Sequence, residues 1–482
     1  MRSYLLLYIN GKKHTIDKQY ARKNLSEYLR EKLNMKGTKI VCSEGDCGAC
    51  TVLVYRYATK EKSSFETINS CIAPLYLLDC CHIITIEGIE ENENLHPVQE
   101  AIAKHHGTQC GFCTPGIVNA MVSMSDSLIK NNEQISEKKI KNFTTGNLCR
   151  CTGYKGILNA GLSLDLKKIT PLFQRYNTQN IQDDFNVTFK EEVNIFDTEN
   201  DLNIILPTSV KKVLELKSKG FKLISGGTDI GVLLNKGYLK SNHIVVLTNV
   251  EEFYKVENDD NFLSFSPMVT LSEVEKHSKN EFPEFSNNLK VFASPQIKHK
   301  GTLIGNIANG SPIGDSIPFL YASDAVLELS SLNDKRDVLL SQFYLDYKKF
   351  DLKADEIITK VKIPKSKKSF KLYKVSARKD LDISAVSLAI GYVLEKNKIV
   401  NISIAYGGVA GTVYKAEKIE KLLYGKEISE ELFKQSTLEI PNLLQPFSDH
   451  RASKEYRIKL CQNLLMKFYQ EISQPIEIKG EF

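Results

Sequence analysis

Two groups of closely spaced cysteines are the residues of this 482-residue chain best suited to chemistry. One group combines Cys110 and Cys113, spaced Cys-x-x-Cys, with Cys149 and Cys151, spaced Cys-x-Cys. Four thiolates that converge from two turns can hold a zinc ion or an iron–sulfur cluster. The Cys-x-Cys half is tighter than the spacing usual for structural zinc, which favours a cluster. A disulfide would need an oxidising compartment, and the N-terminal sequence does not predict a secretory leader.

The other group has a more specific pattern. Residues 42–50 and Cys71 follow the Cys-x₄-Cys-x₂-Cys…Cys spacing of plant-type ferredoxins, which bind a 2Fe-2S cluster. Gly45, Gly48 and Ala49 between these cysteines are small, so the backbone can wrap closely around inorganic sulfurs and direct N–H groups at them. This spacing favours a cluster over structural zinc. Ten of the eleven cysteines precede residue 152, so the N-terminal third is predicted to be the metal-binding part.

The elements around these cysteines change from strands to helices along the chain. Asn10-Gly11 predicts a two-residue hairpin, and an amphipathic helix follows at residues 25–33. Cys80 and Cys81 lie in an apolar run and are predicted to be inert core thiols. Four short helices are expected after residue 90, at residues 98–106, 114–129, 137–146 and 155–166.

The second half of the chain contains two glycine-rich turns. Residues 168–200 are polar and weakly periodic, which predicts a linker. A strand at 221–225 then enters the glycine-rich turn 226–231, and a second glycine-rich loop spans 301–315. Such turns can bind phosphate through backbone N–H groups, although a purely structural turn is about as good an explanation for the first alone. Two phosphate-binding loops together suggest a dinucleotide such as FAD.

Composition and charge exclude several classes of function. The net charge of +6 comes from 64 basic and 58 acidic residues and does not require nucleic acid. A lysine-rich run at 360–374 is predicted to be a solvated strand edge, since no aromatic ladder accompanies it. There is no apolar stretch long enough to span a bilayer. We therefore expect a cytoplasmic protein that binds neither nucleic acid nor membrane.

Both cysteine groups and both glycine loops together resemble the small, iron–sulfur and FAD-binding subunits of bacterial xanthine dehydrogenases, in the molybdenum hydroxylase family. The resemblance implies a multidomain α+β protein. Its parts are a β-grasp 2Fe-2S ferredoxin domain (1–90), a four-helix 2Fe-2S domain (91–167) and the linker (168–200). A vanillyl-alcohol-oxidase-type (PCMH-type) FAD domain (201–368) and an α/β C-terminal flavoprotein domain (369–482) follow.

The resemblance also implies roles for individual residues. One cluster is assigned to Cys42, Cys47, Cys50 and Cys71, and the other to Cys110, Cys113, Cys149 and Cys151. Gln109 matches a glutamine that hydrogen-bonds molybdopterin on a partner subunit. The family's flavin contacts map onto Leu223, Ile224, Ser225, Gly226, Gly227, Thr228, Asp229, Ile230, Phe292, Thr302, Leu303, Ile304, Gly305, Asn306, Asp315 and Lys418.

By the same resemblance, the reaction is oxidation of hypoxanthine and xanthine to urate at molybdenum on a large partner subunit. Electrons are expected to pass through the four-helix cluster, the ferredoxin cluster and FAD to NAD⁺. The expected assembly is a heterotetramer of two small and two large chains. Two alternatives stay open: the equivalent subunit of an aldehyde or N-heterocycle hydroxylase, and a stand-alone iron–sulfur flavoprotein carrier. An aldehyde or N-heterocycle hydroxylase subunit would have the same domains. A stand-alone carrier would leave Gln109 without a pterin to contact.

Overall fold

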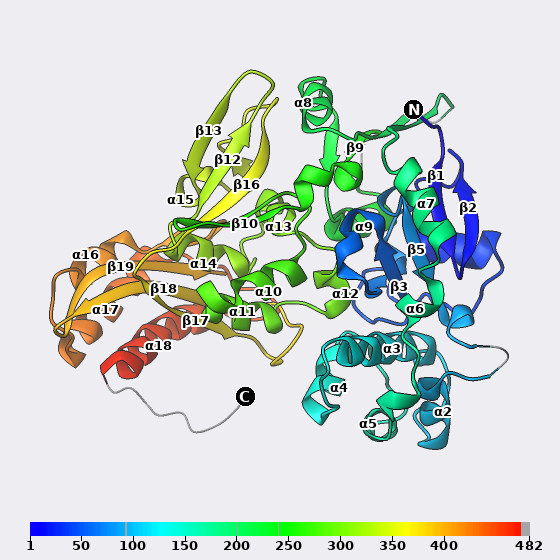
Figure 1. Ribbon diagram of the computed structural model, residues 1–482. Helices are drawn as coiled ribbons and strands as arrows, with labels where there is room; N and C mark the ends of the chain where they lie inside the picture. Colours follow the sequence, from blue (N-terminus) through cyan, green and yellow to red (C-terminus); the bar gives the residue numbers. More distant parts are fainter. Residues whose placement is uncertain (92–93, 200, 240, 474–482) are drawn as a thin grey trace. The chain divides into compact units, whose positions relative to one another are not determined.

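The computed structural model describes residues 1–91, 94–199, 201–239 and 241–473 (Figure 1). Its contacts divide the chain into two compact units. The first unit contains Met1–Lys255, Thr270–Ser272 and Ala293–Gly305, and the second contains the remainder. Both cysteine groups belong to the first unit, so the geometry between them can be described directly.

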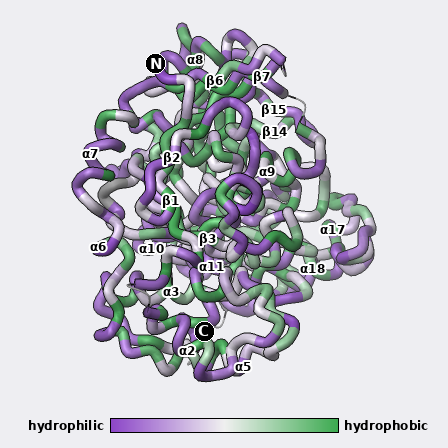
Figure 2. The backbone as a smooth tube through the Cα atoms, turned by 90° about the vertical axis from the view of Figure 1, so that its right-hand side faces the viewer, coloured by the Kyte–Doolittle hydropathy of each residue, from purple (hydrophilic) through white to green (hydrophobic). Residues whose placement is uncertain are grey.

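A mixed five-stranded sheet, in the order β2-β1-β5-β3-β4, builds the N-terminal part of the first unit. Its strands are β1 Leu5–Ile9, β2 Lys12–Ile16, β3 Thr51–Arg56, β4 Glu66–Asn69 and β5 Cys81–Ile84. The predicted Asn10-Gly11 turn joins β1 to β2, and both turn residues have positive φ. β1 is hydrophobic and buried, whereas β2 is mostly hydrophilic, a contrast that can be followed in Figure 2. Helix α1 (Leu25–Glu27) continues into a π-helical turn and packs on this sheet.

Four helices follow, as predicted (cyan to green in Figure 1). They are α2 Pro97–Lys104, α3 Thr114–Lys130, α4 Glu137–Thr144 and α5 Lys155–Leu162. Pro97 occupies the first position of α2, where its missing N–H costs no hydrogen bond. The Ser136 hydroxyl caps α4 by accepting a hydrogen bond from the Lys139 N–H at 3.3 Å. Cys113 immediately precedes α3, so the start of this helix fixes one end of a cysteine turn.

The segment at 168–200, predicted to be a polar linker, contains regular structure instead. It forms α6 (Leu172–Tyr176), α7 (Gln179–Thr188) and strand β6 (Val193–Asp197). Ile181 and Phe185 of α7 are buried in a core shared with the ferredoxin-like sheet, where Phe185 meets Tyr8 edge-on at 5.4 Å. Ile181, Phe185 and Phe189 recur every four residues, so they form one helical face that the polar composition concealed.

A second sheet of the first unit, ordered β6-β7-β9-β8, carries the first glycine turn. Its further strands are β7 Leu202–Leu206, β8 Lys222–Ile224 and β9 His243–Val246, and its helices are α8 Val210–Ser218 and α9 Thr228–Asn235. β7, β9 and β8 run parallel, so their carboxyl ends share one edge. The glycine turn connects the carboxyl end of β8 to the start of α9. The short helix α12 (Pro295–Lys298) also belongs to this unit.

The second unit contains three antiparallel sheets in its described residues. The first of these sheets has, in spatial order, strands β10 Val256–Asn258, β11 Phe262–Phe265, β16 Ile357–Pro364, β12 Val326–Ser330 and β13 Lys335–Leu339. The second pairs β14 Tyr344–Asp346 with β15 Lys349–Phe350. The third has β17 Ser369–Val375, β18 Val386–Glu395, β19 Lys398–Gly407 and β20 Tyr414–Lys415. Its helices are α11 Pro283–Lys290, α14 Ser316–Ala322, α15 Leu340–Phe343, α16 Glu417–Leu423, α17 Glu430–Leu443 and α18 Lys454–Ser473. Helices α10 Leu271–Glu281 and α13 Leu303–Asn309 have residues in both units. The multidomain α+β class is confirmed.

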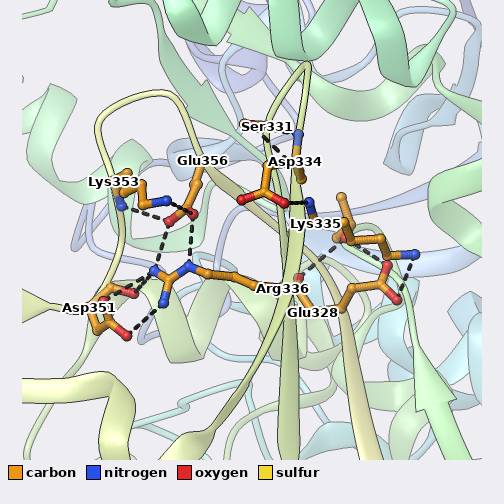
Figure 3. Close-up of polar contacts among 9 residues, drawn as sticks. Glu328, Ser331, Asp334, Lys335, Arg336, Asp351, Lys353 and Glu356 are labelled. Atoms are coloured by element: carbon orange, nitrogen blue, oxygen red, sulfur yellow. Dashed lines mark hydrogen bonds and ion pairs between the residues drawn. The ribbon is translucent and has the colours of Figure 1, made fainter.

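Ion pairs cover the strand surfaces of the second unit. Lysines of the basic run pair with carboxylates, such as Lys362 with Asp337 at 2.9 Å and Lys371 with Glu471 at 3.2 Å. Arg336 on β13 binds two carboxylates at once, Asp351 at 2.8 Å and Glu356 at 2.8 Å (Figure 3). The run lies on β16, the middle strand of its sheet, and on the edge strand β17, and the Lys368 and Lys374 side chains are nearly buried. The prediction of a solvated strand edge therefore holds for only part of the run.

Candidate cofactor sites

The first cysteine group lies on two loops beside the ferredoxin-like sheet. Cys42 and Cys47 occupy an irregular loop, Cys50 directly precedes β3, and Cys71 lies in a short 3₁₀ turn after β4. The backbone N–H groups of Glu44 and Cys47 each lie 3.5 Å from the Cys42 sulfur. The loop thus directs two N–H donors at a cysteine sulfur, and the predicted approach of Gly45, Gly48 and Ala49 to inorganic sulfurs stays a prediction.

The four thiols of this group lie close enough to share hydrogen bonds. The thiols of Cys47 and then Cys71 hydrogen-bond the Cys42 thiolate and hold its pKa far below the ordinary value. The Cys71 thiol in turn donates to Cys50, which raises the pKa of Cys71 and lowers that of Cys50. Cys50 and Cys71 are 1% and 3% exposed. Two cysteines of this group are therefore buried, whereas Cys42 and Cys47 are partly exposed.

The second cysteine group joins the turn before α3 to the turn before α5. The sulfurs of Cys110 and Cys151 lie 3.5 Å apart, and both residues are exposed. Cys113 and Cys149 form the inner pair, with the Cys113 thiol donating toward Cys149; burial, followed by this bond, raises the pKa of Cys113 to about 12. The Thr152 hydroxyl lies 3.1 Å from the Cys149 sulfur. The predicted grouping of these four cysteines is therefore present in the structure.

Exposed side chains surround this second group. Gln109 is exposed beside Cys110, and the aromatic ring of Phe112 is exposed by 51%. Leu148 and Tyr154, which flank the Cys-x-Cys turn, are each 45% exposed. The outer pair of cysteines therefore opens to the surface of this chain, where Gln109 is free to contact a partner.

The two cysteine groups touch through their main chains. The Leu148 N–H donates to the Cys47 carbonyl at 2.9 Å, so one hydrogen bond separates the residue before Cys149 from a cysteine of the first group. A Cβ at Gly48 would lie 2.1 Å from the Gly146 oxygen, and one at Gly116 would lie 2.2 Å from the Gly48 oxygen. Glycine is thus required at these positions for the close approach of the loops as well as for turns.

Two buried amide side chains, which were not predicted from the sequence, stabilise the contact between the two cysteine loops. Asn147 Nδ2 donates to the Gly48 carbonyl at 2.9 Å. Gln296 Nε2, from α12, donates to Asn147 Oδ1 at 2.9 Å and to the Thr51 hydroxyl at 3.2 Å. The sequence could have indicated a role for Asn147, because it lies between the glycine and the first cysteine of the Gly-Asn-Leu-Cys turn. No motif surrounds Gln296 that could have indicated its contact with the cysteine loops.

The candidate flavin residues of the first unit form one pair of loops. A Cβ at Gly226 would lie 2.1 Å from the Lys300 oxygen, and the hydroxyls of Ser225 and Thr302 are 3.0 Å apart. Gly227 has φ +71° and precedes α9, a conformation suited to glycine. The Gly305 N–H donates to the Thr302 hydroxyl at 3.0 Å. The structure therefore brings together residues 223–230 and 302–305, as two cooperating phosphate loops require.

The remaining candidate flavin residues belong to the second unit. Asp315 is buried, and its carboxylate binds Lys374 and accepts a hydrogen bond from Ser384 at 2.6 Å. Phe292 is partly buried, and Asn306 accepts a hydrogen bond from Ser316. Lys418, on α16, pairs with Glu439 at the surface. Asp315 thus has protein partners for both oxygens, and Lys418 has a surface ion pair of its own.

A pocket of about 440 Å³ lies in the second unit beside Val291, the residue before Phe292. Its wall is formed by Glu284, Asn287, Asn288, Val291, Leu372, Lys374, Val375, Ser376, Arg378 and Lys379. The lysine that binds Asp315 therefore also lines this pocket. The wall also carries the carboxylate of Glu284, and Arg378 pairs with Asp382 at 3.5 Å.

Each cysteine group offers the four thiolates that hold a 2Fe-2S centre. Such a centre places four cysteines around two irons, two on each. The inner and outer pairs of the second group, and the backbone N–H groups directed at Cys42, suit that arrangement. When bound, such a centre supplies one-electron transfer, and these cysteines would hold it.

Family models match four consecutive parts of the chain. Residues 7–76 match the 2Fe-2S iron-sulfur cluster binding domain, and residues 85–162 match the 2Fe-2S binding domain. Residues 199–366 match the FAD binding domain in molybdopterin dehydrogenase, and residues 371–472 match the CO dehydrogenase flavoprotein C-terminal domain. The chain therefore has two 2Fe-2S-binding domains followed by an FAD-binding flavoprotein part.

Known proteins share these domains. Xanthine dehydrogenase 1 of Arabidopsis thaliana is 31% identical over 98% of this chain and 40% of its own length. Xanthine dehydrogenase/oxidase of Rattus norvegicus is 30% identical over 98% of this chain and 39% of its own length. The chain thus spans about 40% of the length of these curated relatives. It belongs to the molybdenum hydroxylase family.

Solved structures share the fold of part of the chain. Carbon monoxide dehydrogenase from Hydrogenophaga pseudoflava aligns with a TM-score of 0.53 at 20% identity, covering 55% of this chain and 95% of that chain. Quinoline 2-oxidoreductase from Pseudomonas putida 86 aligns with a TM-score of 0.52 at 23% identity, covering 55% and 94%. Separately, none of the helices in the described residues is both long and apolar enough to cross a membrane.

Proposed function

We propose that this chain is the electron-transfer part of a cytoplasmic xanthine dehydrogenase. It receives electrons from the oxidation of hypoxanthine and xanthine to urate at a molybdenum cofactor on a large partner subunit. The observation that carries this proposal is the main-chain contact between the two cysteine loops, at Cys47 and Leu148. That contact gives electrons a short route from an exposed group of sulfurs to a buried one.

The proposed ligands follow the two geometric groups. Cys42, Cys47, Cys50 and Cys71 hold the first 2Fe-2S centre, and Cys110, Cys113, Cys149 and Cys151 hold the second. Gln109 contacts the pterin of the partner from its exposed position beside Cys110. FAD binds at the loops 223–230 and 302–305 of the first unit and passes electrons to NAD⁺. Phe292, Asn306, Asp315 and Lys418, which belong to the second unit, stay candidate flavin contacts.

The proposed assembly is a heterotetramer with two molybdenum-binding chains. A molybdenum-binding partner is supported by the solved carbon monoxide dehydrogenase, which is described with a molybdenum cofactor and shares the fold of part of this chain. The relatives named xanthine dehydrogenase support a purine substrate. Arg378 and Lys379 at the pocket of the second unit suit an anionic acceptor such as NAD⁺.

The test is to measure two reactions on this chain alone and on the chain with its large partner. We expect NADH oxidation with an artificial dye from the flavin-loaded chain alone, and xanthine oxidation after the partner is added. Gln109→Ala should slow xanthine turnover and leave the dye reaction unchanged. Xanthine turnover by this chain alone would contradict the division of roles, and a flavin-loaded chain without dye activity would indicate another acceptor.

Substrate competition separates the proposal from its alternatives. The complex should turn over xanthine with a higher kcat/KM than an aldehyde or quinoline, and the reverse order would favour the corresponding hydroxylase. Failure to co-purify with any molybdenum-binding chain, with both iron–sulfur signals intact, would favour a stand-alone carrier.

A further inference from the structure

Helix α9 reaches from the first glycine turn to the first cysteine group. At its N-terminus, Gly227 of the glycine turn has φ +71° and directly precedes Thr228, the first residue of the helix. Further along, α9 packs against the 3₁₀ turn Ser70–Ile72, which carries Cys71. All of these residues belong to the first unit. A single helix of eight residues therefore touches the proposed flavin turn at one end and the turn of a proposed cluster ligand along its length.

The contact at Gly231 leaves no space for a side chain. Gly231 is buried, and a Cβ there would lie 2.3 Å from the Ile72 carbonyl oxygen. The neighbouring Val232 packs against the small core that contains Cys50 and Cys71. The main chain of α9 thus lies directly against the residue that follows Cys71. Because packed elements transmit displacements to one another, a shift of this helix would move the turn that carries the cysteine.

The last residue of α9 ties together two segments of the first cysteine group. Asn235 lies one turn after Gly231, on the same face of the helix. Asn235 is exposed, and its side-chain nitrogen donates to the carbonyls of Ser43 and Cys71, each at 2.8 Å. The buried Asn24 side chain donates in turn to Asn235 Oδ1 at 2.6 Å. Asn235 is therefore held in place and links the irregular loop at Ser43 to the turn at Cys71.

These contacts oppose access to the buried part of the first group. Cys50 and Cys71 are 1% and 3% exposed, so an external ligand for iron reaches them only after the surrounding chain opens. Opening of the turn at Cys71 would separate Ile72 from Gly231 and break a hydrogen bond of Asn235. A molecule that binds only to the docked position of α9 opposes this opening, because binding stabilises the state that it selects.

We propose that α9 couples the flavin turn to the first 2Fe-2S centre, so that flavin binding at one end of the helix slows loss of the centre beside it. Gly231 and Asn235 are the positioning residues of this coupling, because they hold the turn that carries Cys71. The coupling is reciprocal: the factor by which flavin stabilises the centre equals the factor by which the centre strengthens flavin binding. It favours chains that hold both cofactors over chains that hold only one.

This inference rests on the proposed function, and its test separates the two. The full chain with both centres is mixed with excess iron chelator, either flavin-free or with saturating FAD, and EPR of reduced samples follows each centre over time. The first centre is the signal that persists in Cys149→Ser. We expect FAD to slow loss of the first centre about tenfold, an ordinary size for coupling between two sites, and to leave loss of the second centre unchanged. In Cys42→Ser, which lacks a ligand of the first centre, the Kd for FAD should rise by the same factor.

Variants of α9 measure how much of this effect passes through its contacts. Gly231→Ala should reduce the effect of FAD to below about twofold, because the added Cβ displaces the Ile72 carbonyl. Asn235→Ala removes only exposed hydrogen bonds and should leave about a threefold effect. Gly237→Ala is the matched control, because Gly237 follows the same helix with φ +70° and a Cβ there meets no described atom within 4 Å. It should strain this segment but keep the wild-type effect of FAD.

The decisive quantity is the ratio of the two rates of loss, with and without FAD. A structural defect alone would speed both rates equally and leave their ratio unchanged. Asn235→Ala carries the test if Gly231→Ala does not assemble the first centre. A wild-type chain that binds FAD but loses the first centre equally fast without it would overturn the coupling alone, as would α9 variants with the wild-type ratio. A wild-type chain that binds no FAD, or lacks two 2Fe-2S signals, would overturn the proposed function and the coupling with it.

Discussion

The two cysteine groups differ in how deeply the chain buries them. Cys50 and Cys71 of the first group are 1% and 3% exposed and pack with Ile72, whereas Cys110 and Cys151 of the second group are exposed. Protein charges act strongly in a buried, low-dielectric site and weakly at a surface. The first group is therefore tuned by its own chain, and the second is accessible to another molecule. This difference suits a relay that accepts electrons at the surface and carries them inward.

The largest expected effect comes from removing one ligand of each group. Cys149→Ser should abolish one of two rhombic EPR signals and about half of the bound iron, and leave the other signal intact. Cys50→Ser should abolish the other signal and also lower the melting temperature, because Cys50 belongs to a packed core. EPR of the dithionite-reduced protein and iron analysis measure both. Loss of both signals in Cys149→Ser, or bound zinc in place of iron, would contradict two independent 2Fe-2S centres.

A smaller effect is expected from separating the two groups without touching a ligand. Gly48 and Gly111 both lie in cysteine loops with positive φ, +70° and +81°. An added Cβ at Gly48 meets the Gly146 oxygen, whereas the space at Gly111 is open to 4 Å. Both alanine variants incur backbone strain of about 1–2 kcal/mol. Gly48→Ala should lose about 1–3 kcal/mol more and break the hydrogen bond between Cys47 and Leu148.

Thermal unfolding and stopped-flow reduction of the flavin measure this pair of variants. We expect both cluster signals to persist in each, but transfer between the centres to slow in Gly48→Ala and to stay near wild type in Gly111→Ala. Equal stability and equal transfer rates in the two variants would mean that the close glycine contact does not couple the centres.

Gln296 offers a milder way to loosen the same contact. Its amide donates to Asn147 and Thr51, which belong to the two cysteine loops. Gln296→Ala leaves the buried Asn147 oxygen without this donor, so it should cost about 1–3 kcal/mol in the free energy of unfolding. Gln435→Ala is the control, since Gln435 is exposed and bonds Glu431 on one helix; it should stay within about 0.5 kcal/mol of wild type. Chemical denaturation of both variants decides the comparison, and equal midpoints would deny Gln296 a role in joining the loops.

The same comparison explains what could be predicted from the sequence. The ligand groups are set by short cysteine spacings, and these are local patterns that a single chain displays. The four helices after residue 90 were likewise marked by proline, serine and glycine at their ends. In both cases the physical cause lies within a few residues of the feature it produces.

Features that depend on distant residues could not be predicted in this way. Gly48 was expected to make room for sulfur, but its contact is with Gly146, almost a hundred residues away. Gln296 donates hydrogen bonds to Asn147 and Thr51 from a helix whose own sequence shows no sign of this contact. The helices within 168–200 were missed because polar residues outnumber the few apolar ones that face the sheet.

The last expected effect is a difference in how Asp126 of the four-helix part and Glu66 of the ferredoxin-like sheet respond to pH. Asp126, near the end of α3 away from Cys113, is 7% exposed, and the Leu172 N–H is the hydrogen-bond donor to its Oδ2 at 3.0 Å. Burial raises the pKa of Asp126 to about 7. Glu66, the first residue of β4, behaves in the opposite way. Burial opposes its ionisation, but Lys62, His299 and Arg56 outweigh that effect and lower the pKa of Glu66 to about 2.

These two shifts give slopes of opposite sign. Between about pH 4 and 7 the native Asp126 keeps a proton that the unfolded chain releases, so its contribution to stability falls as pH rises, by at most about 1.4 kcal/mol per pH unit. The stabilisation from Glu66 is present above about pH 4.3 and is lost as pH falls toward 2. Asp126→Asn should therefore flatten the loss of stability between pH 5 and 7, and Glu66→Gln should flatten the loss in acid. Melting temperatures across pH measure both slopes, and an Asp126→Asn variant that keeps the wild-type slope above pH 5 would show that the second region does not hold a protonated carboxyl.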